Sequence, residues 1–278
     1  MSYEVHPQAI AAPSAPVRVF AGTEPSPVLK TPLVLLHSSL SSKEQWSRLA
    51  QWMGDEYQVI AIDLYGYGES AMPEPGAAFT VADEVDAVMA HINTRIGRRA
   101  FHLVGHSYGG AIALRLAAER SHRISSLSLY EPVAFYLLDQ DDLQRKEVER
   151  LVRKINCCIH EAPAEGARLF IDYWNGPGAF ERLPQQLKSE FIARIGKVKL
   201  DFQALFADRL RIDDLAAFDF PVCLMSGSRS PASTRRIAEI LASAMPQAER
   251  HMFDAGHMAP VTHASQVNPI IAGFVDSW

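Results

Sequence analysis

The sequence predicts an α/β fold with a mostly parallel, doubly wound sheet. Short apolar runs recur along the chain and are almost uninterrupted, as in strands that are buried on both faces of a sheet. Segments with helical spacing separate these runs, and this alternation is typical of parallel strands joined by right-handed crossovers. The chain has 278 residues, enough to bury a sizeable core in one or two domains.

Seven apolar runs are predicted to form strands. In chain order they are Val17–Ala21, Leu33–Leu36, Tyr57–Ile62, Phe101–Val104, Ser126–Tyr130, Pro221–Met225 and Arg250–Phe253. The predicted helices between them are Ser42–Met53, Thr80–Ile96, Gly110–Ala118 and Thr234–Met245. Thr80 and Asp83 form a capping-box pattern at the start of the second helix, which supports its predicted boundary.

The alternation of strand and helix stops between about Val133 and Ala217. An apolar stripe runs from Leu143 to Ile159 with charged residues on its other side, which is typical of an amphipathic helix. Gly176–Gly178 marks a turn, and the α/β pattern resumes near Phe220. We therefore predict a helical cap over residues 133–217, inserted into an α/β core of residues 1–132 and 218–278.

Composition excludes several classes of protein. Acidic residues number 32 and basic residues 27, so the net charge of −5 gives no footprint for binding nucleic acid. No apolar run reaches the length of about 18 residues that a membrane span needs, and Met1–Pro16 lacks the features of a targeting segment. An odd count of 3 cysteines favours a reducing, cytoplasmic location. Composition predicts no oligomeric state.

The segment Gly105–Gly109 carries the strongest chemical signal. It reads Gly-His-Ser-Tyr-Gly, follows an apolar run and opens a predicted helix at Gly110. Such a strand–turn–helix element is sharp enough to need flanking glycines, and it lifts the serine hydroxyl clear of the sheet. Ser107 is therefore the predicted nucleophile. A phosphate loop is excluded because Ala111 stands where that motif needs lysine.

The backbone N–H groups of Tyr108 and Ser39 are predicted to form an oxyanion hole. Tyr108 directly follows the nucleophile, and Ser39 lies in the loop after Leu33–Leu36. His37 is expected to organise this loop. Aromatic residues of the insertion favour a small-molecule substrate with an apolar acyl or aromatic part. The predicted substrate contacts are His37, Ser38, Phe135 and Trp174.

These motifs give the chain a resemblance to the α/β-hydrolase superfamily, in particular to esterases, cofactor-free haloperoxidases and carbon–carbon bond hydrolases. The resemblance covers about Val17–Pro132 and Phe220–Trp278. It rests on Leu35–His37, Asp63–Ser70, the elbow at Gly105–Gly110 and Gly256–His257. It implies an α/β-hydrolase fold in which the helical insertion covers the active site. We expect no cofactor, and we expect no metal because no ligand spacing suggests one.

Chain order in this fold selects the base that a serine nucleophile requires. The base follows the last strand, and His257 lies just past Arg250–Phe253, so His257 is the predicted base. His263 is the alternative. His106 is expected to pack within the elbow, and His102 is expected to be a hydrogen-bonded core histidine.

The acid that would orient this base is missing from its usual place. Ser230 stands where the family usually has Asp, and residues 220–237 contain no Asp or Glu. Glu131 ends the strand Ser126–Tyr130 at the same carboxyl edge as the nucleophile, so it is the predicted acid. Asp219 precedes its strand and should lie at the opposite edge. The remaining alternatives are Asp254, Asp213, Asp214 and a Ser–His dyad without an acid.

The sequence thus favours a serine hydrolase that cleaves a small carboxylic ester through a Ser–His–acid triad and an acyl-enzyme. The same groups could cleave a thioester, a lactone or a carbon–carbon bond beside a ketone. Relatives with dehalogenase or epoxide hydrolase activity use Asp as nucleophile, so Ser107 argues against those reactions. The missing acid at Ser230 motivates a second hypothesis, a ligand-binding protein with a vestigial hydrolase site.

Overall fold

The computed structural model describes residues 29–74, 76 and 78–278. The predicted strand Val17–Ala21 and the segment Met1–Pro16 lie outside these residues. Within them, six parallel strands form one sheet in the order β2-β1-β3-β4-β5-β6. The strands are β1 (Thr31–Leu36), β2 (Tyr57–Ile62), β3 (Phe101–His106), β4 (Ile124–Tyr130), β5 (Val222–Gly227) and β6 (Glu249–Phe253). Each contains most of one predicted apolar run.

Helices alternate with the strands of this sheet. They are α1 (Ser47–Met53), α2 (Val81–Ile96), α3 (Tyr108–Glu119), α8 (Ala232–Ala244), α9 (Ala259–Thr262) and α10 (Ala264–Asp276), with 3-10 turns η1 (Lys43–Trp46) and η2 (Ser121–Arg123). The predicted helix Ser42–Met53 is divided into η1 and α1. The capping box of α2 is present, because Thr80 and Asp83 each accept a hydrogen bond from the other's backbone N–H.

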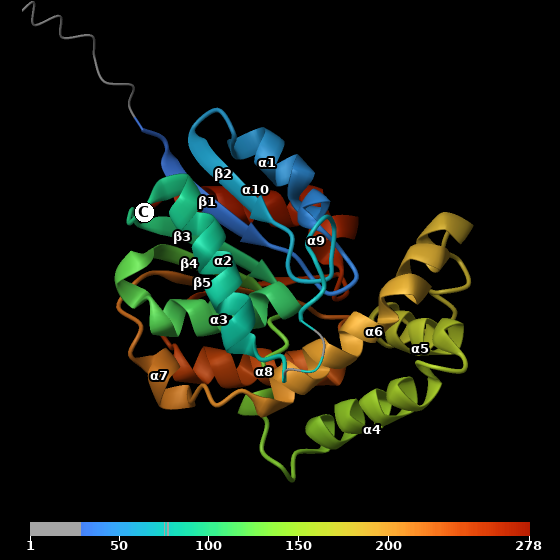
Figure 1. Cartoon of the computed structure of the whole chain (residues 1–278). Coiled ribbons are helices and arrows are strands. Elements are labelled where there is room, and N and C mark those ends of the chain that lie inside the picture. The colour runs from blue at the N-terminus through green and yellow to red at the C-terminus, as the bar shows by residue number, and fades with distance from the viewer. Residues whose placement is uncertain (1–28, 75, 77) are drawn as a thin grey trace, which may run out of the picture.

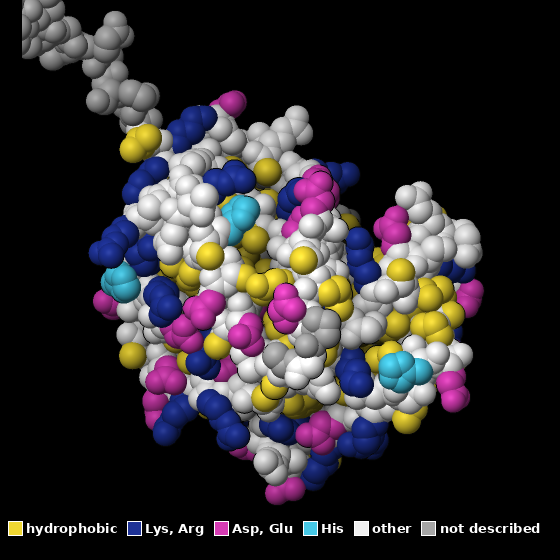
Figure 2. Space-filling model, in the orientation of Figure 1, with side chains coloured by type: hydrophobic (Ala, Val, Ile, Leu, Met, Phe, Trp, Pro, Cys, Tyr) yellow, Lys and Arg dark blue, Asp and Glu magenta, His cyan; other side chains and the backbone are white. Residues whose placement is uncertain are grey.

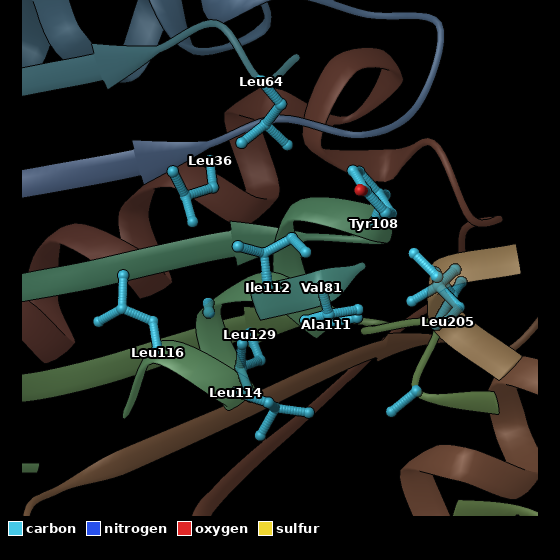
Figure 3. Close-up of a cluster of buried hydrophobic side chains, with 14 of the residues drawn as sticks. Leu36, Leu64, Val81, Tyr108, Ala111, Ile112, Leu114, Leu116, Leu129 and Leu205 are labelled. Atoms are coloured by element: carbon cyan, nitrogen blue, oxygen red, sulfur yellow. The ribbon is translucent and has the colours of Figure 1, made fainter. Parts of the chain in front are cut away.

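The sheet is covered on both faces, as a doubly wound fold requires. Along β1, Leu33 and Leu35 face an apolar cluster that α1 and α10 complete, whereas Val34 and Leu36 face a larger cluster with α2 and α3. Side chains of a strand point alternately to its two faces, so both faces of β1 are apolar. Figure 3 shows part of the larger cluster, to which Leu205 also contributes.

The segment between β4 and β5 is helical. It contains η3 (Phe135–Leu137), α4 (Leu143–Cys158), α5 (Pro163–Asn175), α6 (Gln185–Ala207) and α7 (Ile212–Ala216). Figure 1 shows α4, α5 and α6 grouped on the side of the molecule toward which the strand arrows point. Leu205 of α6 anchors this segment in the larger core cluster. No helix in the described part of the chain combines the length and the apolar character needed to cross a bilayer.

The strand register brings several loops to one edge of the sheet. Leu36 pairs with Gly105 and His106 pairs with Tyr130, so β1, β3 and β4 end side by side. The loops that follow these strands therefore begin at the same carboxyl edge. Ligand sites of open α/β sheets lie at this edge, and the helices between β4 and β5 face it.

Candidate active site

Ser107 occupies a strained turn between β3 and α3. Its backbone angles are φ 55° and ψ −116°, and its N–H donates to the Tyr130 carbonyl at 3.0 Å. The flanking glycines are required by close packing. A Cβ atom on Gly109 would lie 2.4 Å from the His37 oxygen, and one on Gly105 would lie 2.7 Å from the Gly109 oxygen. The predicted elbow is therefore the geometry that the chain adopts.

Three side chains form a continuous hydrogen-bonded relay at the carboxyl edge. His257 Nε2 lies 2.8 Å from Ser107 Oγ, and His257 Nδ1 lies 2.7 Å from Glu131 Oε2. The second oxygen of Glu131 accepts a hydrogen bond from the Gly227 N–H at 2.7 Å. Ser107, His257 and Glu131 are 6%, 2% and 1% exposed, so water competes little for these contacts.

Backbone strain is concentrated at this relay. Among the described non-glycine residues, positive φ angles occur at Leu40 (57°), Ser107 (55°) and Glu131 (42°). Leu40 directly follows Ser39 in the loop that faces the elbow. Such conformations cost on the order of 1–3 kcal/mol each, and they persist where the surrounding structure enforces them. All three strained positions therefore border one site.

The His257 ring is held from two further sides. Trp174 of α5 stacks on it, with ring centroids 4.2 Å apart and planes at 25°. His106 Nε2 donates a hydrogen bond to the His257 carbonyl at 2.8 Å. Burial lowers the pKa of His106 well below its usual value, so the ring is neutral, and the carbonyl acceptor favours the tautomer with the proton on Nε2. The predicted packing role of His106 agrees with this contact.

The loop after β1 is fastened to the elbow. The Gly109 N–H donates to the His37 carbonyl at 3.1 Å, and the Ser38 N–H donates to Gln45 Oε1 at 3.1 Å. Within residues 29–74, 76 and 78–278, the N–H groups of Tyr108 and Ser39 have no hydrogen-bond acceptor. These are the two donors that the sequence predicts for an oxyanion hole.

The structure corrects one predicted substrate contact. His37 is fully buried and lies outside the lining of the cleft described below. Its Nε2 accepts a hydrogen bond from the Leu64 N–H at 3.0 Å, and its Nδ1 lies 2.7 Å from the Ser38 carbonyl. Burial lowers the pKa of His37 to about 4, so the ring is neutral. Both ring nitrogens are used by the backbone, and His37 organises the loop.

The alternative residues considered from the sequence lie elsewhere. Asp254 is exposed and contacts Arg229, with 3.4 Å between carboxylate and guanidinium. Asp213, Asp214 and Asp219 are exposed as well. His263 contacts Thr262 Oγ1 at 2.8 Å. His102 is buried and bonded to the Ser126 hydroxyl, as expected for a core histidine.

A cleft of about 850 Å³ opens over the relay. Its walls come from the loop after β1, from α5 and α6, and from α9. Figure 2 shows the molecule hollowed between the sheet domain and the lobe that carries α5 and the start of α6. Ser38, Ser107, Trp174 and His257 line this cleft.

A much smaller pocket of about 10 Å³ continues inward from Ser107. Phe135 and Trp174 line it together with other apolar side chains, and so does Asp201 of α6. This volume corresponds to about one water molecule. Of the predicted substrate contacts, Phe135 lines the small pocket, Ser38 lines the cleft and Trp174 lines both. Their contact with a substrate stays a prediction.

Sequence reasoning did not identify the polar side chains that surround the loop after β1. Gln45 accepts the Ser38 N–H, and Asp201 accepts a hydrogen bond from the Ser39 hydroxyl at 2.6 Å. Asp201 also pairs with Lys197, one helical turn earlier. An acid and a base four residues apart within the predicted helical cap were an available signal, because residues at this spacing lie on one face of a helix and can pair.

Comparison with known proteins assigns the family. A model of the alpha/beta hydrolase family matches residues 33–270. The chain therefore belongs to this family, which is one of hydrolases, and the predicted superfamily and fold class are confirmed. The enol-lactonase from Burkholderia xenovorans LB400 has a similar structure, with a TM-score of 0.73 at 19% sequence identity, covering 89% of this chain and 92% of that one.

Two curated relatives differ in how much of each chain they cover. The esterase YbfF of Escherichia coli (strain K12) is 24% identical over 251 residues, which cover 87% of this chain and 90% of that protein. The probable lysophospholipase BODYGUARD 4 of Arabidopsis thaliana is 31% identical over 124 residues, or 44% of this chain. The chain spans 28% of the length of that second relative.

Proposed function

We propose that this protein hydrolyses a small carboxylic ester, with Ser107 as nucleophile, His257 as base and Glu131 as acid. The observation that carries the proposal is the relay from Glu131 through His257 to Ser107, with both contacts at 2.7–2.8 Å. The similarity to an esterase over 87% of this chain agrees with it. The vestigial-site hypothesis rested on a missing acid, and the contact of Glu131 with His257 Nδ1 supports the catalytic hypothesis instead.

In the proposed reaction, the Ser107 oxygen attacks the ester carbonyl while His257 Nε2 takes its proton. The carbonyl oxygen becomes negatively charged and is bound by the N–H groups of Tyr108 and Ser39. The carbon–oxygen ester bond then breaks, and His257 returns the proton to the leaving alcohol. Water, activated by the same imidazole, cleaves the acyl-enzyme. Glu131 stabilises the imidazolium in both stages.

The two cavities differ in size and lining, and this difference suggests where the acyl group and the alcohol of the ester bind. The leaving alcohol must receive its proton from His257, and His257 lines the 850 Å³ cleft but not the 10 Å³ pocket. We therefore place the alcohol in the large cleft and the acyl group in the small pocket, whose volume is close to that of one water molecule. We thus infer an ester with a very short acyl group and a larger, partly apolar alcohol.

The nucleophile is tested by replacing Ser107 with Ala. Turnover of p-nitrophenyl acetate should fall by about 10³-fold or more, since removal of one triad member leaves only residual catalysis. A fluorophosphonate probe should label the folded native protein and fail to label Ser107→Ala, with Ser121→Ala as a labelled control. Retained turnover in Ser107→Ala would remove Ser107 from this role, and an unlabelled native protein would favour the ligand-binding hypothesis.

The acyl assignment is tested with p-nitrophenyl esters of increasing chain length. We expect kcat/KM to be highest for the acetate and to fall about 10-fold or more for the butyrate and the octanoate, because the small pocket must open to admit extra methylenes. A maximum at the octanoate would place the acyl chain in the large cleft. Turnover of lactones or diketones without ester turnover would instead support the lactonase or carbon–carbon hydrolase alternative.

We also infer a cytoplasmic protein that acts on a small molecule. Cys157, Cys158 and Cys223 are all free thiols, which suits a reducing compartment. Expression of the full chain followed by cell fractionation tests this inference.

A further inference from the structure

One fully buried lysine lies beneath the loop after β1. Lys197 of α6 pairs with Asp201 on the same helix and lies 3.7 Å from Glu84 Oε2 of α2. The rings of Tyr67 and Tyr108 surround its ammonium group at 5.0 and 4.9 Å from their centroids. Burying three charged groups together is expensive unless each is well paired, and such a cluster often gives specificity of geometry more than stability.

The two carboxylates of this cluster each hold one residue of the proposed oxyanion hole. Asp201 Oδ2 accepts a hydrogen bond from the Ser39 hydroxyl at 2.6 Å. Glu84 Oε2 accepts a hydrogen bond from the Tyr108 hydroxyl at 2.9 Å. Lys197 therefore lies between Asp201, which binds Ser39, and Glu84, which binds Tyr108. Ser39 and Tyr108 belong to different elements, and this cluster connects their side chains across the site.

We propose that Lys197, Asp201 and Glu84 are positioning residues that hold the backbone N–H groups of Ser39 and Tyr108 at the oxyanion. The inference rests on the proposed function and extends it to groups that never touch the substrate. Oxyanion donors are effective because they are fixed before the charge develops, so displacement of their peptide groups lowers kcat more than substrate affinity. The cap helix α6 thereby contributes to the geometry of the catalytic site.

The mildest test removes the side-chain contacts and keeps both N–H donors. Ser39→Ala and Tyr108→Phe should each lower kcat for p-nitrophenyl acetate by about 10-fold with little change in KM. Each substitution should also weaken the binding of phenyl trifluoromethyl ketone by a similar factor, because the adduct of this inhibitor with Ser107 carries an oxyanion. In the double variant Ser39→Ala/Tyr108→Phe, the fold-loss in kcat should be smaller than the product of the two single fold-losses, because both contacts act through one cluster.

Tyr173→Phe is the matched control. The Tyr173 hydroxyl of α5 is 2.8 Å from the Ser233 hydroxyl of α8, so this variant removes one cap-to-core hydrogen bond outside the cluster. It should lower the melting temperature about as much as Tyr108→Phe and leave kcat unchanged. Two results would overturn the proposal: a change in KM without a fall in kcat, or a fall in kcat that parallels the fall in melting temperature in all three variants. Ser107→Ala tests the nucleophile independently of these results.

The lysine itself is tested without leaving an extra buried charge. Lys197→Met alone would leave two buried carboxylates unbalanced and could prevent folding. The double variant Lys197→Met/Glu84→Gln removes one charge of each sign, so the net charge of the cluster is unchanged. We expect it to bind substrate with a similar KM and to lose about 30-fold or more in kcat. An unchanged kcat in this folded variant would show that the cluster serves only stability.

Discussion

Glu131 has a strained backbone conformation, and both oxygens of its carboxylate accept hydrogen bonds. Its φ of 42° places it in the left-handed region, where residues with a Cβ are strained. The conformation turns the chain directly after β4, so that one carboxylate oxygen meets the Gly227 N–H and the other meets His257. The strain is compensated by these two buried, charge-assisted hydrogen bonds.

Replacing Glu131 with Gln tests its proposed role. The amide oxygen can still accept from Gly227, but the NH₂ group would face His257 Nδ1 and favour the wrong tautomer. We expect kcat for ester hydrolysis to fall by about 10²- to 10⁴-fold with little change in KM. Asp254→Asn is the control, because Asp254 is exposed and contacts Arg229 instead of His257. A silent Glu131→Gln variant would contradict the assignment.

At the residue scale, the sequence indicates those candidate site residues that belong to local motifs. The sequence predicts a role for Ser107 because its turn needs glycines at fixed offsets, and for Glu131 because parallel strands end at one edge. The contacts of both residues with His257 support these roles, which stay predictions. Lys197 and Asp201 could not be assigned to the site, since no motif or strand end in the sequence marks their contacts with Glu84 and Ser39. The prediction that His37 organises the loop agrees with its contacts. The predicted substrate contact of His37 is wrong, because a loop position does not reveal that both ring nitrogens bind the backbone.

At the scale of elements, the approach of α3 to β1 decides the shape of the site. Gly109 in the first turn of α3 lies so close to the end of β1 that its N–H bonds the His37 carbonyl. The contact joins the turn that carries Ser107 to the loop that carries Ser39. Because a side chain at this position would meet backbone atoms, neither element could adjust by changing a rotamer.

Gly109→Ala should therefore destabilise the protein by about 3 kcal/mol, since its Cβ would lie 2.4 Å from the His37 oxygen and the backbone would have to move. Gly196→Ala provides the control. Gly196 lies within α6 with nothing within 4 Å of an added Cβ, so alanine should stabilise by about 0.5–1 kcal/mol. Urea unfolding of both variants measures the difference. Equal effects of the two substitutions would exclude steric contact as the cause.

Elements with a strong local pattern were the easiest to predict. The fully buried strand β3 and the capping box of α2 have boundaries that the sequence marks directly. Helix α3 begins at Tyr108, two residues before the predicted start, because the strained Ser107 serves as its N-cap without a side-chain cap bond. The predicted limits of the cap, 133 and 217, have no comparable marker, because η3 and α7 pack into the larger core cluster.

At the scale of the whole molecule, buried histidines make stability depend on pH. Burial lowers the pKa of His37 to about 4, and burial also lowers the pKa of His106 well below its usual value. Below a pH of about 6.5, these rings bind protons in the unfolded chain but not in the folded one. Protons therefore favour unfolding as the pH falls from about 6.5 toward 4. Glu84, whose pKa burial raises, acts in the opposite direction.

The contribution of one histidine can be isolated by comparing pH profiles. Each buried neutral histidine should reduce the free energy of unfolding by about 1.4 kcal/mol for every pH unit below its unfolded pKa. His37→Gln should be less stable than the native protein at pH 7, because it loses buried packing. Its free energy of unfolding should nevertheless fall less steeply between pH 6 and pH 5, since Gln does not titrate. The slopes of the two proteins should differ by about 1.4 kcal/mol per pH unit. Urea unfolding at pH 7, 6 and 5 gives both slopes, and parallel profiles would mean that His37 is already protonated in the folded state. The contribution of Glu84 is common to both proteins and cancels in this comparison.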